Sequence, residues 1–182
     1  MKYDENLKIS GEYTAISISP LVKKDSKILA EIREAIKTGN KKILNIMKES
    51  GLILDIKECH NLIPTTGRTV LARLLTGDTT YSGEIDWGAL GSAATPAFTN
   101  ASTKLGTEVY RMQATAQSYD QNVVYIDWFL SAEDVANQTF EEFGAFIDGT
   151  SSADSGQAWS LLKTGGWVKS GSLFITGKYT II

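Results

Sequence analysis

The sequence predicts a mainly β protein, an antiparallel β-sandwich with a small N-terminal α+β (β-α-α-β) appendage. Past residue 60, short alternating apolar runs are separated by glycine- and serine-rich turns, a pattern typical of sandwiches. Before residue 60, two amphipathic helical stripes lie between two strand-like runs. Glycine follows the same division, with 3 residues before position 61 and 13 from there on. We therefore expect an N-terminal attachment region at 1–60 and a β-sandwich domain at 61–182.

The N-terminal region shows a strand pattern at each end. Residues 7–19 close in a strict alternation of isoleucine with small residues, which predicts a half-buried strand. A helix follows, which Gly39 ends and after which Asn40 caps a second helix at about 41–50. Residues 52–57 predict the second strand.

The sandwich domain begins with a predicted helix at 66–76, which Thr65 or Thr66 would cap. The strands expected after it are 84–90, 108–117, 122–130, 140–148, 158–163 and 172–182. The strand at 122–130 is apolar on both faces, which favours a central position. Trp128 lies on this strand, so we expect it in the core, where replacement by alanine would cost about 3–5 kcal/mol.

Charge and composition exclude several classes of partner. The net charge of −3 offers no basic patch for nucleic acid. The N-terminus lacks the apolar core of a signal peptide, and no window approaches the roughly 20 apolar residues of a membrane span. We therefore expect neither a nucleic-acid nor a membrane partner. Cys59 is the single cysteine, so an intrachain disulfide is excluded.

The residues that could carry chemistry do not form a catalytic pattern. Cys59 and His60 are adjacent, and neighbours on an extended chain point to opposite faces, so they cannot hydrogen-bond as a nucleophile and its base. Glu108 and Arg111 are an odd number apart, so on one strand they would face opposite sides and not pair. We predict no catalytic residue and no cofactor.

Two kinds of ligand site are weaker alternatives. Oxygens of Asp148, Thr150, Ser151 and Asp154 could surround Ca²⁺, but their spacing matches no EF-hand loop and is ordinary turn chemistry, so no metal site is predicted. Exposed rings near the glycine-rich C-terminal turns could stack on sugar, and the candidates for such contacts are Trp159, Trp167 and Tyr179. Trp167 lies between two glycine-containing turns, so its replacement by alanine would cost only about 1 kcal/mol.

Four segments together resemble a group of tailed-bacteriophage virion proteins. They are Asn61-Leu-Ile-x-Thr-x-Gly-Arg68, Ala89-Leu-Gly91, Thr103-x-Leu-Gly-Thr-Glu-Val-x-Arg111 and Phe146-Ile-Asp-Gly149. Members of this group are small β-rich tail-fibre, baseplate or other structural components. The resemblance covers residues 61–182, and it implies no catalytic residues.

The expected function is that of a non-enzymatic virion structural protein, tail-associated or decorating the particle. It would be made in the host cytoplasm and act in the virion through subunit–subunit contacts. Its expected partners are other virion proteins, in a homo-oligomer or another symmetric assembly. The alternative is a carbohydrate-binding adhesin whose sandwich loops contact a host surface glycan.

Overall fold

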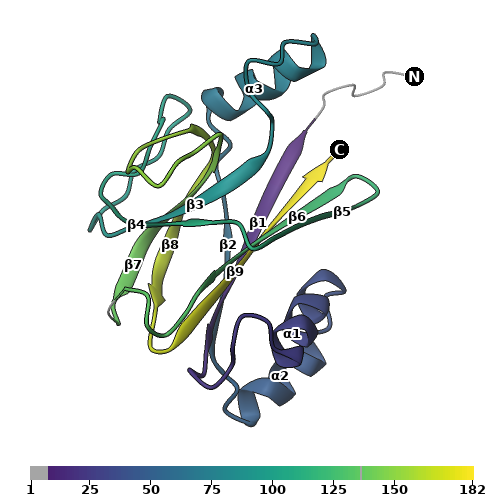
Figure 1. Ribbon diagram of the computed structural model, residues 1–182, viewed down its shortest axis with the longest axis vertical. Helices are drawn as coiled ribbons and strands as arrows, with labels where there is room; N and C mark the ends of the chain where they lie inside the picture. Colours follow the sequence, from purple (N-terminus) through teal and green to yellow (C-terminus); the bar gives the residue numbers. More distant parts are fainter. Residues whose placement is uncertain (1–7, 136) are drawn as a thin grey trace.

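Two antiparallel sheets pack face to face in the computed structural model, which describes residues 8–135 and 137–182 (Figure 1). The strands are β1 (Ile9–Ile18), β2 (Ile53–His60), β3 (Ile85–Gly91), β4 (Glu108–Gln113), β5 (Ala116–Asp120), β6 (Val123–Leu130), β7 (Thr139–Ile147), β8 (Gln157–Val168) and β9 (Ser172–Ile181). The larger sheet has the order β2-β1-β9-β6-β5, and the smaller has β4-β3-β7-β8. The predicted antiparallel two-sheet fold is confirmed.

The N-terminal segment has the predicted β-α-α-β order, and its strands belong to the larger sheet. β1 lies between β2 and β9 and pairs with β9 from Ile9↔Ile181 to Ile18↔Ser172. Its two faces are both buried, since Tyr13 joins the core between the sheets and Ile16 joins the core beneath the helices. Residues 8–60 thus contribute two strands to the larger sheet, and the two helices between them lie outside it.

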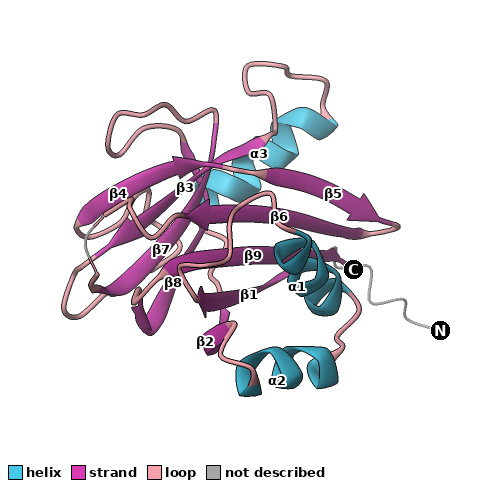
Figure 2. Cartoon of the chain, turned by 60° about the horizontal axis from the view of Figure 1, so that its bottom comes forward, coloured by secondary structure: helices cyan, strands magenta, loops and turns pink. Residues whose placement is uncertain are grey.

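The two N-terminal helices, α1 (Lys27–Lys37) and α2 (Lys41–Glu49), cover the outer face of the larger sheet (Figures 1 and 2). Ser26 caps α1 by accepting a hydrogen bond from the Leu29 N–H at 3.2 Å. Asn40 caps α2 as predicted, and Gly39 before it has a φ of +66°, which glycine adopts without strain. Arg33 fixes α1 to the sheet through a 2.5 Å ion pair with Asp127.

The third helix, α3 (Thr65–Leu75), lies at the end of the sandwich opposite α1 and α2 (Figure 1). Neither predicted threonine caps it: the N-cap is Pro64, which has no side-chain hydrogen bond, and Thr65 is already helical. The Thr66 hydroxyl instead donates to the Ala158 carbonyl at 3.0 Å. A Cβ on Gly67 would lie 2.7 Å from the Trp159 carbonyl oxygen, so glycine permits the close approach of α3 to β8.

The predicted strand at 108–117 is wrong, because the chain changes sheets within it. Ala114 donates its N–H to the Asp86 carbonyl at 2.8 Å, whereas Thr115 donates to the Asp127 carbonyl at 2.7 Å. The first contact lies on the smaller sheet and the second on the larger one. β4 and β5 are therefore edge strands of different sheets joined by two residues.

The prediction that Trp167 is exposed in a turn is also wrong. Gly165 and Gly166 both have positive φ, and they form an irregularity inside β8 instead of ending it. The strand continues, and the Trp167 ring lies 5.6 Å from that of Phe143 with 1% of the residue exposed. Trp128 is fully buried beside the same phenylalanine, as predicted.

Candidate functional site

The three aromatic residues predicted to contact a ligand are all buried. Trp159 is 8% exposed, and Trp167 and Tyr179 are 1% exposed, so none presents a ring face on which a sugar could stack. The Tyr179 hydroxyl hydrogen-bonds to the Ser160 hydroxyl at 3.0 Å and to that of Tyr13. Burial raises the pKa of both tyrosines, which keeps this hydroxyl cluster neutral. The cluster is a polar part of the core.

Cys59 and His60 are adjacent on β2, so their side chains point to opposite faces and do not form a nucleophile–base pair. The Cys59 thiol donates to the Thr164 carbonyl at 3.3 Å. Burial raises the pKa of this thiol, whereas an activated nucleophile needs a lowered one. The environment of Cys59 therefore favours the unreactive thiol.

The two aspartates considered as Ca²⁺ ligands contact different residues. Asp148 accepts hydrogen bonds from the Ser82 N–H at 3.0 Å and the Ser82 hydroxyl at 2.5 Å. Asp154 pairs with Lys104 at 2.7 Å. Within residues 8–135 and 137–182, no group of three or more His, Cys, Asp or Glu side chains is placed to hold a metal ion.

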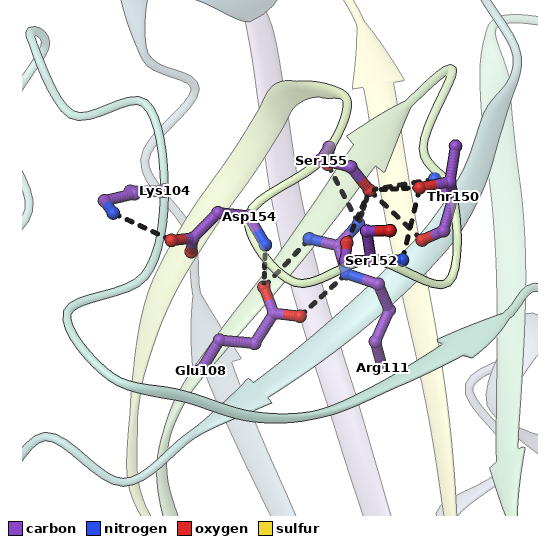
Figure 3. Close-up of polar contacts among 7 residues, drawn as sticks. All are labelled: Lys104, Glu108, Arg111, Thr150, Ser152, Asp154 and Ser155. Carbon is purple, nitrogen blue, oxygen red and sulfur yellow. Dashed lines mark hydrogen bonds and ion pairs between the residues drawn. The ribbon is translucent and has the colours of Figure 1, made fainter.

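Glu108 and Arg111 form a buried bidentate ion pair, contrary to the expectation that they face opposite sides (Figure 3). The guanidinium Nε and Nη2 lie 2.7 and 2.8 Å from the two carboxylate oxygens, and both side chains are 4% exposed. The cause is an irregularity in the β3–β4 ladder, where Leu90 pairs with Tyr110 but Gly91 pairs with Glu108. Val109 is thus an extra residue, which returns Glu108 to the face of Arg111.

This ion pair joins the loop at 148–156 to β4. Arg111 Nη1 donates to the Ser155 carbonyl at 2.9 Å, and its guanidinium lies 4.5 Å from the centre of the Phe146 ring. Glu108 accepts the Asp154 N–H at 3.1 Å, while Lys104 of the loop before β4 pairs with the Asp154 carboxylate (Figure 3). The buried pair therefore holds the loop at 148–156, and the exposed Lys104–Asp154 pair joins that loop to the one before β4.

Glu142 is a second buried carboxylate, and it holds the long loop at 92–107. It is fully buried on β7 and accepts the N–H groups of Gly106 at 2.8 Å and Thr107 at 3.0 Å. Leu105 of this loop packs with Phe146 on the outer face of the smaller sheet. Glu142 was not predicted from the sequence as a buried carboxylate. Its alternation with Phe146 on one face of an apolar strand would have indicated that it is buried.

Replacing Glu142 with glutamine should loosen this loop. The amide retains one acceptor oxygen but loses the charge that strengthens two hydrogen bonds, so we expect a loss of about 1.5–3 kcal/mol in the free energy of unfolding. Limited proteolysis should show faster cleavage within 92–107. Glu141→Gln is the matched control, because that neighbouring side chain is only partly buried. Equal effects of the two variants would contradict the role of Glu142.

A groove of about 630 Å³, here called the α3 groove, runs between α3 and the first residues of β1. Its lining residues are Lys8, Ile9, Ser10, Gly11, His60, Asn61, Leu62, Ile63, Arg68, Leu71, Ala72 and Leu75. Among the described residues that line the groove, most of the wall is aliphatic, three side chains are basic and none is acidic. A smaller apolar cavity of about 150 Å³ adjoins it beneath α3, where Trp159 and Tyr179 line the wall.

Comparisons of the chain with protein-family models, curated proteins and solved structures found no match. None of the helices in the described part of the chain is long and apolar enough to cross a membrane.

Proposed function

We propose that the chain is a non-enzymatic structural protein of a tailed-phage virion, tail-associated or decorating the particle, which acts through contacts between subunits. It would be made in the host cytoplasm and then incorporated into the particle. The main support for the proposal is the exposure of apolar side chains on the outer surface of α2. Ile43 and Ile46 are 37% and 54% exposed there, one helical turn apart and among lysines.

Charge is distributed in a way that favours association between copies. Residues 20–50, which contain both N-terminal helices, carry eight basic and four acidic side chains, a balance of +4. The whole chain has a net charge of −3, so the remainder carries −7. A basic helix pair on one copy is therefore attracted to the acidic remainder of another, and salt weakens this attraction.

The segments behind the resemblance to virion proteins support a structural role. Arg111 contacts Phe146, Glu108 bonds to Arg111, and Gly91 and Gly106 leave room for the Glu142 carboxylate. A Cβ on Gly91 would lie 2.3 Å from that carboxylate. These residues thus fix the loops of the smaller sheet in place, so the segments that resemble virion proteins stabilise the fold.

The adhesin alternative loses the contacts first considered for it. Stacking on a sugar requires exposed rings, and Trp159, Trp167 and Tyr179 are buried. The loops at 92–107 and 148–156 are held to the smaller sheet by Glu142 and by the Glu108–Arg111 pair. The burial of these rings therefore favours the structural function over the adhesin.

Incorporation into particles tests the proposal. The chain should be detected by mass spectrometry at a constant ratio to other virion proteins in washed particles. The double substitution Ile43→Ser and Ile46→Ser should reduce incorporation at least about tenfold, because each isoleucine contributes about 1.5–3 kcal/mol when fully buried. Tyr119→Ser on β5, an exposed aromatic on another surface, is the control. Absence of the chain from washed particles would overturn the proposal.

A further inference from the structure

At the α3 groove, no strand of the described residues pairs with one side of the first part of β1. β2 pairs with β1 as far as Glu12↔His60, and the Asn61 N–H reaches the Gly11 carbonyl at 3.4 Å. The chain then crosses to the other sheet, where Leu62 and Leu161 exchange hydrogen bonds of 2.8 and 2.9 Å. No residue of β2 therefore lies opposite Ile9.

The backbone of Ile9 points into the groove. Lys8 exchanges two 2.7 Å hydrogen bonds with Ile182, so the Lys8 backbone is directed away from the groove and towards the C-terminal strand. Successive residues of an antiparallel strand direct their N–H and C=O groups to opposite neighbours. The N–H and C=O of Ile9 thus face the groove, where no strand among residues 8–135 and 137–182 pairs with them.

The opposite wall is a stripe of α3. Arg68, Leu71, Ala72 and Leu75 follow the i, i+3, i+4, i+7 spacing of one helical face. Leu75 is 73% exposed, which is unusual for a large apolar side chain. A strand edge with an aliphatic wall beside it is suited to an extended segment, whose backbone pairs with the edge and whose alternate side chains meet the wall.

Two further observations restrict the chemistry of the occupant. The Asn61 side chain lines the groove, and its buried amide oxygen and nitrogen have no hydrogen-bond partner within residues 8–135 and 137–182. This amide could donate a hydrogen bond to a carbonyl of a bound peptide and accept one from its N–H. The described part of the lining includes Arg68 and His60 and no carboxylate, so its charge is complementary to an acidic side chain.

We propose that the α3 groove binds an extended segment of a partner protein with alternating apolar and acidic residues, which adds as a strand beside β1. Its backbone bonds to Ile9, its apolar side chains contact Leu71 and Leu75, and an acidic side chain pairs with Arg68. That this partner belongs to the same particle rests on the proposed function. The binding of the segment does not, since it is tested on the purified chain alone.

Fluorescence anisotropy with synthetic hexapeptides tests the proposal. The probe is a fluorescein-labelled peptide that alternates valine with glutamate, and the comparison is the same peptide with lysine in place of glutamate. We expect the acidic peptide to bind and the basic one to bind at least about tenfold more weakly, a difference of about 1.4 kcal/mol. Methylation of the backbone nitrogens of the acidic peptide should abolish binding, because it removes the donors that pair with β1.

Two matched variants and one local measurement complete the test. Arg68→Gln should weaken the acidic peptide about tenfold, whereas Arg73→Gln should not, because Arg73 on the same helix already pairs with Asp78 at 2.7 Å. Hydrogen exchange should show protection of the Ile9 N–H when the acidic peptide binds. Equal binding of both peptides, equal effects of the two variants, or no protection at Ile9 would each overturn the proposal. If the purified chain were an oligomer that Arg68→Gln dissociates, and neither peptide bound, the groove would hold a second copy of this chain and the proposal would be wrong.

Discussion

Replacing Arg111 with methionine is expected to lower the free energy of unfolding by about 3–5 kcal/mol, the cost of leaving a buried charge without its partner. The Glu108 carboxylate would lose both of its guanidinium hydrogen bonds in a site where it is 4% exposed. The Ser155 carbonyl would lose its donor at the same time. Urea denaturation monitored by tryptophan fluorescence measures the change.

Two further variants separate the buried pair from ordinary surface charge. Arg73→Met removes a comparable ion pair with Asp78 that is far more exposed, and it should cost at most about 1 kcal/mol. Glu108→Leu combined with Arg111→Met should destabilise the protein less than Arg111→Met alone, because no unpaired charge remains. If Arg111→Met and Arg73→Met had equal effects, the role assigned to the buried pair would be wrong.

Replacing Trp167 with alanine is expected to cost about 3–5 kcal/mol, the range for large-to-small substitutions in a core. The indole is 1% exposed and packs against Phe143, which also contacts Trp128. Trp128→Ala should therefore cause a loss of the same size. Thermal and urea unfolding of both variants checks this, with Tyr119→Ala as an exposed control expected within about 0.5 kcal/mol of the parent. A loss of about 1 kcal/mol for Trp167→Ala would instead place its ring outside the core.

Periodicity along the chain was enough to predict the two-sheet class and the N-terminal helices. The alternation around Ile16 predicts a strand, which β1 confirms although both of its faces are buried, and Asn40 caps α2 as predicted. Local signals do not specify which sheet a strand joins. That is why the change of sheet after Gln113 and the insertion of β1 beside β9 were not predicted.

Irregularities in the ladders account for the other errors. Val109 is an extra residue in β4, so the Glu108 side chain lies on the opposite face from the one predicted. The two glycines in β8 resemble a turn in the sequence, although the strand continues to Trp167. A period-two argument fails wherever such an insertion occurs. The α3 groove could not be predicted, because it is formed by residues from β1, from the end of β2 and from α3.

The most direct test of the central claim, that the chain acts through subunit contacts, is its mass in solution. Light scattering on the purified chain, alone and mixed with phage particles that lack it, provides this measurement. The account predicts an assembly larger than the 19.8 kDa chain, or retention on the particles, and in both cases a contact that weakens as salt is added. A stable 19.8 kDa monomer at every concentration, with no retention on the particles, would contradict it.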